Sequence, residues 1–455
     1  MYQKESHFRV IVSTSPPVGN GMMSWLSPIN LHQYAFLPTR LPPKNVLKTN
    51  KKIIIHSSPQ PFSLFILDSF LPSLYSIIRI MSTTSKSSKA SPPNTEITIL
   101  VPDDFHHHFR DGIKTKHVVH HTNQRFKRCI AMPNLSPPVT TAPMATDYRQ
   151  RILSHLPTQT PDSNSNSNSQ WEMEPLMTLY LTDATSPQDI QEASKYDYIK
   201  ACKLYPANAT TNSAHGVTNV KLIYPALREM AKCGLLLLLH SEVTGDDIDI
   251  FDREAQFITD IMTPLAVDHP NLKMVMEHIS TKQAVEYICH DAPPNVAASI
   301  TAHHMLYNRN AILVGGIKPH FYCLPILKRE THRRALVTAA TSGNPRFFAG
   351  TDSAPHTVMM KESVCGCAGV YTAHAAVELY AEVFDTEGAL DKLEGFLSHH
   401  GADFYGLERN TELLTLTKES WEVPYSYPFG WEGDRDETVK GLRHGEYVHW
   451  KIVGI

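Results

Sequence analysis

The sequence predicts an α/β protein whose strands close into a TIM-like (β/α)8 barrel. The first observation behind this prediction is that eight short apolar runs recur between residues 105 and 350. The second is that segments with helical periodicity separate most of these runs, as in a barrel built from βα units. The third is that residues able to bind a metal fall near the ends of several runs, where the active sites of such barrels form.

The predicted elements follow one another in a regular order along the chain. The strands are expected at residues 105–109, 128–132, 176–181, 199–204, 235–240, 273–277, 296–300 and 347–350. The helices are expected at residues 144–156, 187–196, 220–233, 252–267, 281–289 and 325–341. A further apolar run, 97–101, precedes the first strand, and we expect it to pair against the barrel's edge or to cover its floor.

Two segments have compositions unlike that of a packed domain. Residues 1–94 carry ten Lys and Arg side chains against two acidic ones and are rich in Ser and Pro. This composition resembles an organellar transit segment, although translation that starts at Met81 explains it equally well. Residues 158–170 are rich in Ser and Asn, which favours a flexible loop. We therefore expect an N-terminal extension over 1–94 and one barrel domain over 95–455.

The overall composition is that of a soluble globular protein. Hydrophobic residues make up 42%, charged residues 19%, and the net charge is -3, so nothing indicates a nucleic acid or a membrane as partner. Residues 62–80 are apolar, but Asp68 and Pro72 interrupt them, which makes a poor membrane span. The seven cysteines are scattered, and Cys365 and Cys367 more simply pack in a tight turn than bind metal. We expect a cytoplasmic protein, or an organellar one if the N-terminal extension is a genuine transit peptide.

Histidine is unusually frequent, with 25 copies, and several copies fall at the ends of predicted strands. His106 and His108 lie two residues apart on the first strand, so their side chains share a face and can bind one metal, whereas His107 points towards the helices. Each residue alone is more often a hydrogen-bonded structural group or a helix cap than a ligand. Together, four imidazoles and one carboxylate on one barrel face predict a metal centre. The other members of this set are His240, His278 and Asp352.

Lys203 lies near the end of the fourth predicted strand and needs a separate argument, because an ammonium group is not a metal ligand. A buried lysine loses its proton readily, and the neutral amine can then add carbon dioxide to form a carbamate. That anion has two oxygens and could bridge two metal ions. Imidazole and carboxylate ligands suit zinc. Lys200 is the competing lysine, but three residues away on a strand it should face the opposite side.

Seven stretches of the sequence resemble the dihydroorotase family, specifically its compact single-function type. These are DDFHHHFRDG, MPNLSPPVTT, KLYPANATTNSAHGVT, HSEVT with DIDIFDREAQFI, EHIST, NRNAILVGGIKPHFYCLPILKR and GTDSAPH with KESVCGCAG. The resemblance covers residues 103–407 and implies a barrel of the amidohydrolase type. It also implies the reversible zinc-dependent hydrolysis of (S)-dihydroorotate to N-carbamoyl-L-aspartate, a step of pyrimidine (UMP) biosynthesis. The Ser/Asn-rich loop and the histidine at position 107 depart from the family's usual pattern.

The resemblance further implies a site with two zinc ions per chain, bridged by carboxylated Lys203. One zinc would be bound by His106, His108 and Asp352, and the other by His240 and His278. Asp352 would also take the proton of the attacking hydroxide and pass it to the leaving ring nitrogen.

The same resemblance implies how the substrate is held. Arg110, Asn134 and His356 would grip its carboxylate, since Arg offers a rigid fork and the other two add donors. We expect a homodimer with a small-molecule substrate. The remaining substrate contacts would come from His108, His240, the backbones of Leu324 and Ala368, and the loop residues Thr210 and Thr211.

Two other functions are compatible with part of this pattern. A hydantoinase or allantoinase would use much the same metals, but the carboxylate grip of Arg110, Asn134 and His356 favours dihydroorotate. A non-catalytic barrel that serves as a binding partner is the second alternative. Every expected ligand position is filled in this sequence, which favours an enzyme.

Overall fold

The computed structural model describes residues 95–156, 171–364, 366–432 and 435–454. The predictions for the N-terminal extension, for the loop 158–170 and for Cys365 lie outside the described residues. Within the described residues, no helix has both the length and the apolar character needed to cross a membrane.

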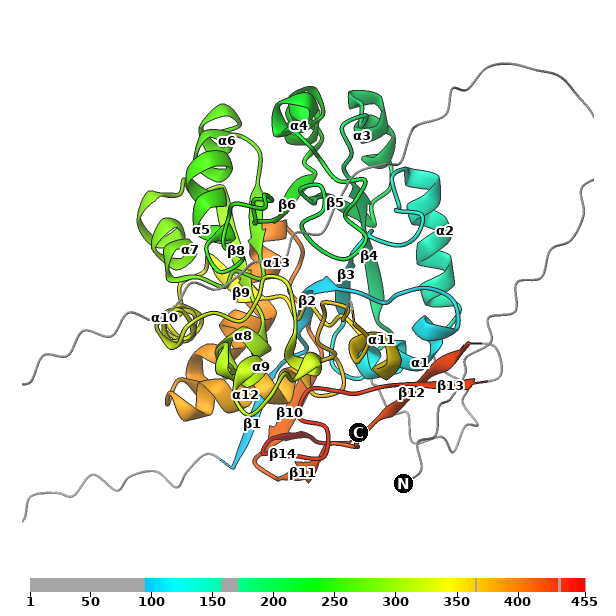
Figure 1. Ribbon diagram of the computed structural model, residues 1–455, viewed down its shortest axis with the longest axis vertical. Coiled ribbons are helices and arrows are strands. Elements are labelled where there is room, and N and C mark those ends of the chain that lie inside the picture. The colour runs from blue at the N-terminus through cyan, green and yellow to red at the C-terminus, as the bar shows by residue number, and fades with distance from the viewer. Residues whose placement is uncertain (1–94, 157–170, 365, 433–434, 455) are drawn as a thin grey trace, which may run out of the picture. The chain divides into compact units, whose positions relative to one another are not determined.

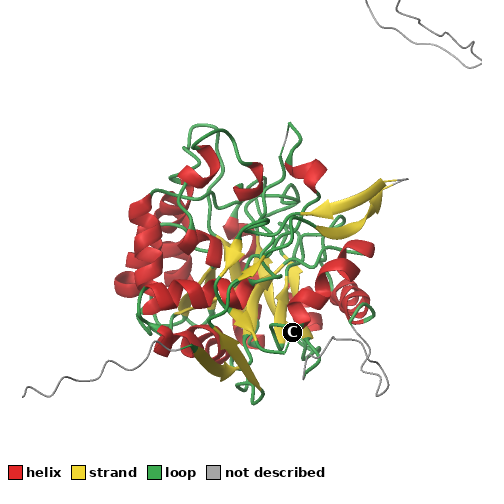
Figure 2. Cartoon of the chain, turned by 90° about the horizontal axis from the view of Figure 1, so that it is seen from below, coloured by secondary structure: helices red, strands yellow, loops and turns green. Residues whose placement is uncertain are grey.

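Eight parallel strands form the centre of the structure, and each pairs with the next one along the chain (Figures 1 and 2). The ring closes where the first strand meets the segment after the last, because His108 N donates to Ser353 O at 3.1 Å and Asp352 N donates to His106 O at 2.9 Å. The predicted barrel is therefore confirmed, together with all eight strands. They are β2 (Asp103–His107), β3 (Arg128–Ala131), β4 (Glu174–Tyr180), β5 (Ile199–Leu204), β6 (Leu236–His240), β7 (Met274–Glu277), β8 (Val296–Ile300) and β9 (Phe347–Ala349).

Helices surround this barrel (Figure 1). They are α1 (Ile113–Asn123), α2 (Ala142–Leu153), α3 (Pro187–Ala193), α4 (Tyr224–Cys233), α5 (Arg253–Phe257), α6 (Thr263–Asp268), α7 (Lys282–Glu286), α8 (Ala302–Leu306), α9 (Asn310–Leu313), α10 (Glu330–Thr341), α11 (Val358–Lys361), α12 (Ala376–Thr386) and α13 (His400–Tyr405). Short 3-10 and π segments are η1 (Val220–Ile223), η2 (Ile258–Met262), η3 (Tyr287–Asp291), η4 (Pro319–Phe321), η5 (Leu390–Lys392) and η6 (Gly395–His399).

The predicted helices are confirmed in kind but differ at their ends. The segment predicted at 325–341 begins only at Glu330, because Arg329 before it is extended, with φ -67° and ψ 161°. The segment predicted at 252–267 is helical from Arg253 to Asp268 and contains the π turn η2. Helix α1 was not predicted, since its threonines, histidines and asparagine hide the apolar period, and only Val118 and Val119 supply a buried apolar stripe.

The bottom of the barrel is closed by aromatic packing. Phe105 on β2 lies with its ring centroid 5.3 Å from that of Phe348 and 4.8 Å from that of Tyr405 in α13. Gly401 is required at this contact, because a Cβ there would lie 2.1 Å from the Phe105 ring. The interior below the site is therefore a filled core and not a channel.

The C-terminal residues form β structure that the sequence analysis did not predict. Strand β1 (Glu96–Leu100) pairs antiparallel with β10 (Leu413–Thr417), which in turn pairs with β15 (Lys451–Ile452). The expectation that residues 97–101 pair against the barrel's edge is therefore wrong, because β10 supplies the partner strand. Figure 1 shows β1 in blue beside the orange β10, although they lie at opposite ends of the described chain. The remaining strands are β11 (Trp421–Glu422), β12 (Tyr427–Glu432), β13 (Arg435–Val439) and β14 (Tyr447–Val448).

Candidate active site

All six metal-site residues expected from the sequence lie at one end of the barrel, and all are buried. His106 and Lys203 lie on β2 and β5, His240 ends β6, and His278 follows β7 directly. Asp352 follows β9, where its backbone closes the barrel. Parallel strands end at the same face, so residues up to 246 positions apart in sequence, from His106 to Asp352, meet in one place.

Three ligand atoms of this group lie at nearly equal distances from one another. His106 Nε2 and His108 Nε2 are 3.1 Å apart, and Asp352 Oδ1 lies 3.3 Å from the first and 3.1 Å from the second. Ligand atoms at zinc's usual bond lengths and tetrahedral angles are roughly 3.3 Å apart. The three side chains therefore fit one zinc ion without rearrangement.

His278 links this triad to His240. The centroid of its ring lies 4.9 Å from that of His106 and 4.9 Å from that of His240. Its Nδ1 is buried without a hydrogen-bond partner. His240 Nε2 lies 2.8 Å from Glu242 Oε2, which orients the ring and leaves Nδ1 for another partner. Two imidazoles beside the triad can therefore accept a second cation.

Lys203 is fully buried next to these groups, and its ammonium is paired with Glu277. The other oxygen of Glu277, Oε1, lies 3.0 Å from His106 Nδ1. Burial lowers the pKa of Lys203, although Glu277 opposes that change. The neighbouring Lys200 is only partly buried, which agrees with the prediction that it faces the other way.

The protonation states follow from burial and from the nearby carboxylates. Burial lowers the pKa of His108 to about 3 and holds the pKa of His278 well below its usual value. Burial would also lower the pKa of His106, but Glu277 and Asp352 outweigh it and raise that pKa to about 9. Burial would raise the pKa of Asp352, yet His106 and His108 hold it well below its usual range. Neutral imidazoles and an ionised carboxylate are the forms that bind metals, so His106 would have to lose a proton when a metal binds.

The backbone is strained at two of these residues and at the nearby Arg110. Arg110, His278 and Asp352 have φ values of 64°, 43° and 45°, a region that non-glycine residues rarely adopt. Such strain persists only where the surroundings hold it, and it concentrates at functional sites. Asp104 helps to fix the backbone next to these positions, because its carboxylate accepts hydrogen bonds from His106 N at 3.1 Å and Thr351 N at 2.8 Å.

The residues expected to grip a carboxylate also converge. Arg110 Nε donates to Pro355 O at 2.8 Å, and its Nη2 lies 2.9 Å from His356 Nε2. The same nitrogen of His356 lies 2.9 Å from Ala368 O. Gly369, the next residue, has φ 146°, and a Cβ there would lie 2.6 Å from Ala354 O. Only glycine therefore lets this backbone approach the site so closely.

The loop that carries Thr210 and Thr211 lies over the same space. Asn134 Nδ2 donates to Thr211 O at 3.2 Å, and Thr211 Oγ1 donates to Ala368 O at 3.5 Å. A pocket at this place is lined by every expected substrate residue except His356 and by every expected metal residue except Lys203. Its lining is His106, His108, Arg110, Asn134, Tyr205, Thr210, Thr211, His240, His278, Leu324, Asp352, Ala354, Ala368 and Gly369.

Sequence reasoning missed several residues that support this site. Glu277 and Glu242 stand next to expected ligands, in EHIST and HSE, and that adjacency was the available signal. Tyr205 lines the pocket, with the Lys203 Nζ 5.0 Å from its ring centroid. Lys361 stands in the matching stretch KESVCGCAG, but its role was not predicted because it depends on three backbone carbonyls that folding brings to its ammonium.

Comparison with known proteins identifies the family. The chain is 56% identical over 356 residues to the dihydroorotase of Teredinibacter turnerae, covering 78% of this chain and 98% of that protein. It is 54% identical over 358 residues to the dihydroorotase of Vibrio vulnificus, covering 79% and 99%. The chain belongs to the dihydroorotase family. No model of a protein family matches the sequence.

Solved structures agree with this assignment. Dihydroorotase from Saccharomyces cerevisiae in complex with 5-fluoroorotic acid matches with a TM-score of 0.69 and 31% identity, covering 79% of this chain and 98% of that one. Dihydroorotase from Campylobacter jejuni gives the same TM-score and identity, covering 80% and 98%. The L-hydantoinase of Arthrobacter aurescens, with a TM-score of 0.61 at 15% identity and coverage of 78% and 82%, shares the fold alone. The chain is thus an enzyme, a hydrolase of the dihydroorotase type that acts in pyrimidine biosynthesis.

Proposed function

We propose that this dihydroorotase uses two zinc ions, a carboxylated lysine and a dedicated carboxylate grip to interconvert (S)-dihydroorotate and N-carbamoyl-L-aspartate. The observation that carries the proposal is the triad of His106, His108 and Asp352. Its ligand atoms lie 3.1 to 3.3 Å apart, beside a pocket that Arg110 also lines. A metal triad next to a guanidinium suits a substrate with both a reactive amide and a carboxylate.

In this proposal His106, His108 and Asp352 would hold one zinc, and His240 and His278 would hold the other. Bound zinc supplies Lewis-acid polarisation of the amide carbonyl and lowers the pKa of a water molecule. Glu277 Oε1 near His106 Nδ1, and Glu242 near His240, keep the ligand rings in fixed orientations. Outer partners of this kind typically change metal affinity by ~10- to 100-fold when removed.

Lys203, carboxylated at its amine, would help to hold both metals. Full burial and a lowered pKa favour the neutral amine, which is the form that adds carbon dioxide. Its place on β5 lies among the ligands from β2, β6 and β7. Glu277, its partner in the present arrangement, then retains His106 as its neighbour.

The substrate carboxylate is proposed to bind between Arg110, Asn134 and His356. Arg110 is partly buried and its guanidinium is oriented by Pro355 O, and Tyr148 OH donates to its backbone carbonyl at 2.8 Å. His108 and His240 line the same pocket and add contacts to the substrate. The backbone groups of Leu324 and Ala368 would contact the ring amide of the substrate. Thr210 and Thr211 would cover the bound substrate.

Asp352 is proposed as the catalytic base. Its carboxylate is buried and lines the pocket, and His106 and His108 hold its pKa well below the usual range. It can accept a proton from the attacking water and return it to the ring nitrogen as the carbon–nitrogen bond breaks. The same groups serve the condensation direction by microscopic reversal.

We also propose a homodimer in the cytoplasm that needs neither a nucleic acid nor a membrane as partner. The net charge of -3 supports only the absence of a nucleic-acid partner, since it supplies no excess of positive charge for a polyanion. An organellar location follows instead if residues 1–94 are a transit peptide.

The test combines metal analysis with one turnover assay. We expect about two zinc ions per chain and turnover of dihydroorotate far above that of hydantoin, which lacks the carboxylate. Active protein with only trace metal would refute the metal centre. Equal turnover of the two compounds would replace this function with a hydantoinase-like one.

A further inference from the structure

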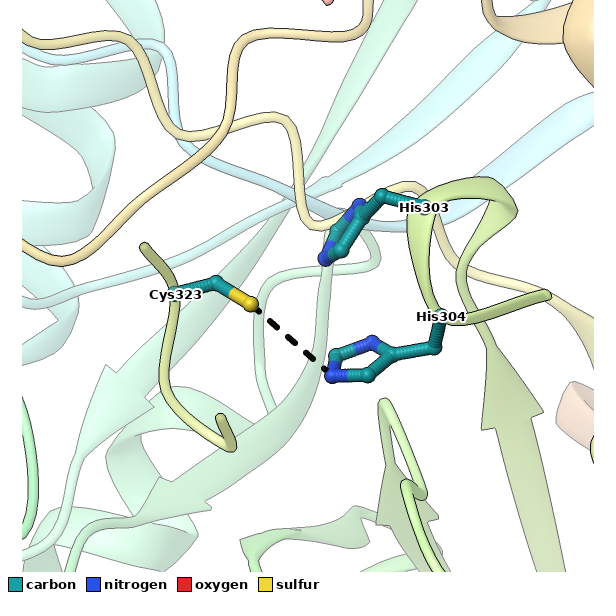
Figure 3. Close-up of side chains that lie close together, drawn as sticks. All are labelled: His303, His304 and Cys323. Carbon is teal, nitrogen blue, oxygen red and sulfur yellow. Dashed lines mark hydrogen bonds between the residues drawn. The ribbon is translucent and has the colours of Figure 1, made fainter. Parts of the chain in front are cut away.

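A second cluster of metal-binding side chains lies outside the proposed zinc site. His303 and His304 lie in α8, which follows β8, and Cys323 lies in the loop that follows η4. All three are buried, and their ligand atoms lie within 4.8 Å of one another. Figure 3 shows both imidazole rings turned towards the sulfur. None of these residues takes part in the proposed mechanism.

His303 is the unexplained member of the cluster. Its side chain is 1% exposed, and neither ring nitrogen has a hydrogen-bond partner. Buried polar groups are nearly always paired, so a ring with two unpaired nitrogens calls for an explanation. Its ring centroid lies 4.6 Å from that of His304, which places the unpaired nitrogens beside other donor atoms.

Two protons of the cluster converge on one carbonyl oxygen. Pro325 O lies 2.9 Å from His304 Nε2 and accepts a hydrogen bond of 3.2 Å from Cys323 Sγ. The distance between Sγ and His304 Nε2 is 3.9 Å (Figure 3). A single cation could replace both protons, because the sulfur, the nitrogen and the carbonyl oxygen already face a common point.

His304 also has the outer contact that metal-binding histidines usually have. Its Nδ1 lies 2.7 Å from Thr301 Oγ1, and Thr301 Oγ1 in turn accepts from His304 N at 3.1 Å as the cap of α8. When Nε2 binds a metal, the single ring proton of the neutral imidazole moves to Nδ1, which then donates to this hydroxyl. The ring is therefore already oriented for coordination through Nε2.

We propose that His303, His304 and Cys323 form a further metal site, with Pro325 O as an additional ligand, for a borderline divalent cation of the zinc type. Two imidazoles and one thiolate select zinc or cadmium over magnesium or calcium, which prefer oxygen ligands. Binding releases the thiol proton, so affinity falls as the pH is lowered. The site is distinct from the proposed catalytic pair, whose ligands include no sulfur.

Sulfur makes the site measurable in the presence of the catalytic metals. The experiment adds cadmium chloride to the zinc-loaded enzyme and records both bound cadmium and the ultraviolet charge-transfer band of a cadmium–thiolate bond. We expect one additional equivalent to bind with this band. No band, or no additional equivalent, would overturn the proposal.

Two variants assign the ligands. Cys323→Ser should abolish the band, and His303→Gln, which keeps a polar side chain of similar size, should weaken cadmium binding by roughly tenfold or more. The matched control is Cys289→Ser, since Cys289 is a free, half-buried cysteine on η3. That variant should behave like the wild type.

The reverse pattern refutes the site. A band that survives in Cys323→Ser, or that disappears in Cys289→Ser, would assign the cadmium to another thiol. Circular dichroism and retained zinc establish that each variant is folded. If Cys323→Ser does not fold, His303→Gln decides the matter, because unchanged cadmium affinity there would exclude the proposed ligand set.

Discussion

Lys361 and Gly369 are joined by a 2.8 Å hydrogen bond from the buried ammonium to the backbone carbonyl. The same ammonium donates to the carbonyls of Tyr322 and Cys367, both at 2.8 Å. One cation therefore connects two backbone stretches, the one that leads to Leu324 and the one that contains Ala368. Burial lowers the pKa of Lys361 to about 8, while the three carbonyl oxygens favour its charged form.

Lys361→Met should remove the hydrogen bonds that hold two backbone stretches in place, the one that leads to Leu324 and the one that contains Ala368. Hydrogen bonds to a charged group contribute about 1.5–3 kcal/mol each, so we expect KM for dihydroorotate to rise about tenfold or more while kcat changes much less. Steady-state kinetics measure this split. Lys282→Met, which alters an exposed lysine on α7, is the matched control. An unchanged KM in Lys361→Met would show that the ammonium does not position these backbones.

Asp352→Asn should fold and bind substrate but turn it over slowly, because the amide cannot accept the proton. Loss of one general base typically costs ~10² to 10⁴-fold in rate. Rapid kinetics with metal analysis separate this effect from metal loss. Asp391→Asn, which changes an exposed carboxylate, serves as control. Unchanged kcat with a raised KM would contradict the assigned role.

Arg110→Lys preserves charge but removes the planar fork that matches a carboxylate. We expect kcat/KM for dihydroorotate to fall, whereas the slow turnover of a ring analogue without the carboxylate should change little. Comparing the two substrates isolates the carboxylate contact from general damage to the site. A similar loss on both substrates would argue against a specific grip.

Lys203→Ala removes the proposed bridging group. The variant should lose most activity, and its bound zinc should drop, as measured by elemental analysis. Lys200→Ala is the matched control, since Lys200 lies on the same strand but is only partly buried. Wild-type rates in Lys203→Ala would exclude the carbamate.

Deletion of residues 1–80 should leave both activity and stability intact. Every expected metal ligand and substrate contact lies after Asp103, and β1, which pairs with β10, begins at Glu96. The measurement compares melting temperature and kcat/KM for chains that start at Met1 and at Met81. A large loss in the shorter chain would make the N-terminal segment a folded part of the enzyme.

The sequence by itself determined the barrel and the face on which the proposed metal ligands meet. Buried parallel strands appear as continuous apolar runs, and such runs are visible locally because each strand is covered on both faces. Residues such as His240 and His278 stand directly at the ends of these runs. The geometry of a parallel barrel therefore predicts that they lie on the same face of it. The substrate-binding residues could be predicted only from the family resemblance, because nothing in the local sequence around Asn134 or Ala368 indicates a contact with substrate.

Only the tertiary structure decided how distant groups are paired. Strand β1 finds its partner in β10, with Thr98 opposite Thr415, a relationship that no local periodicity encodes. Glu277 acquires its role from the ammonium of Lys203 and the ring of His106, and Lys361 from three carbonyls in separate loops. The unpaired ring of His303 is likewise visible only after folding. These features depend on contacts between residues far apart in the chain, whereas strands and strand ends depend on neighbours.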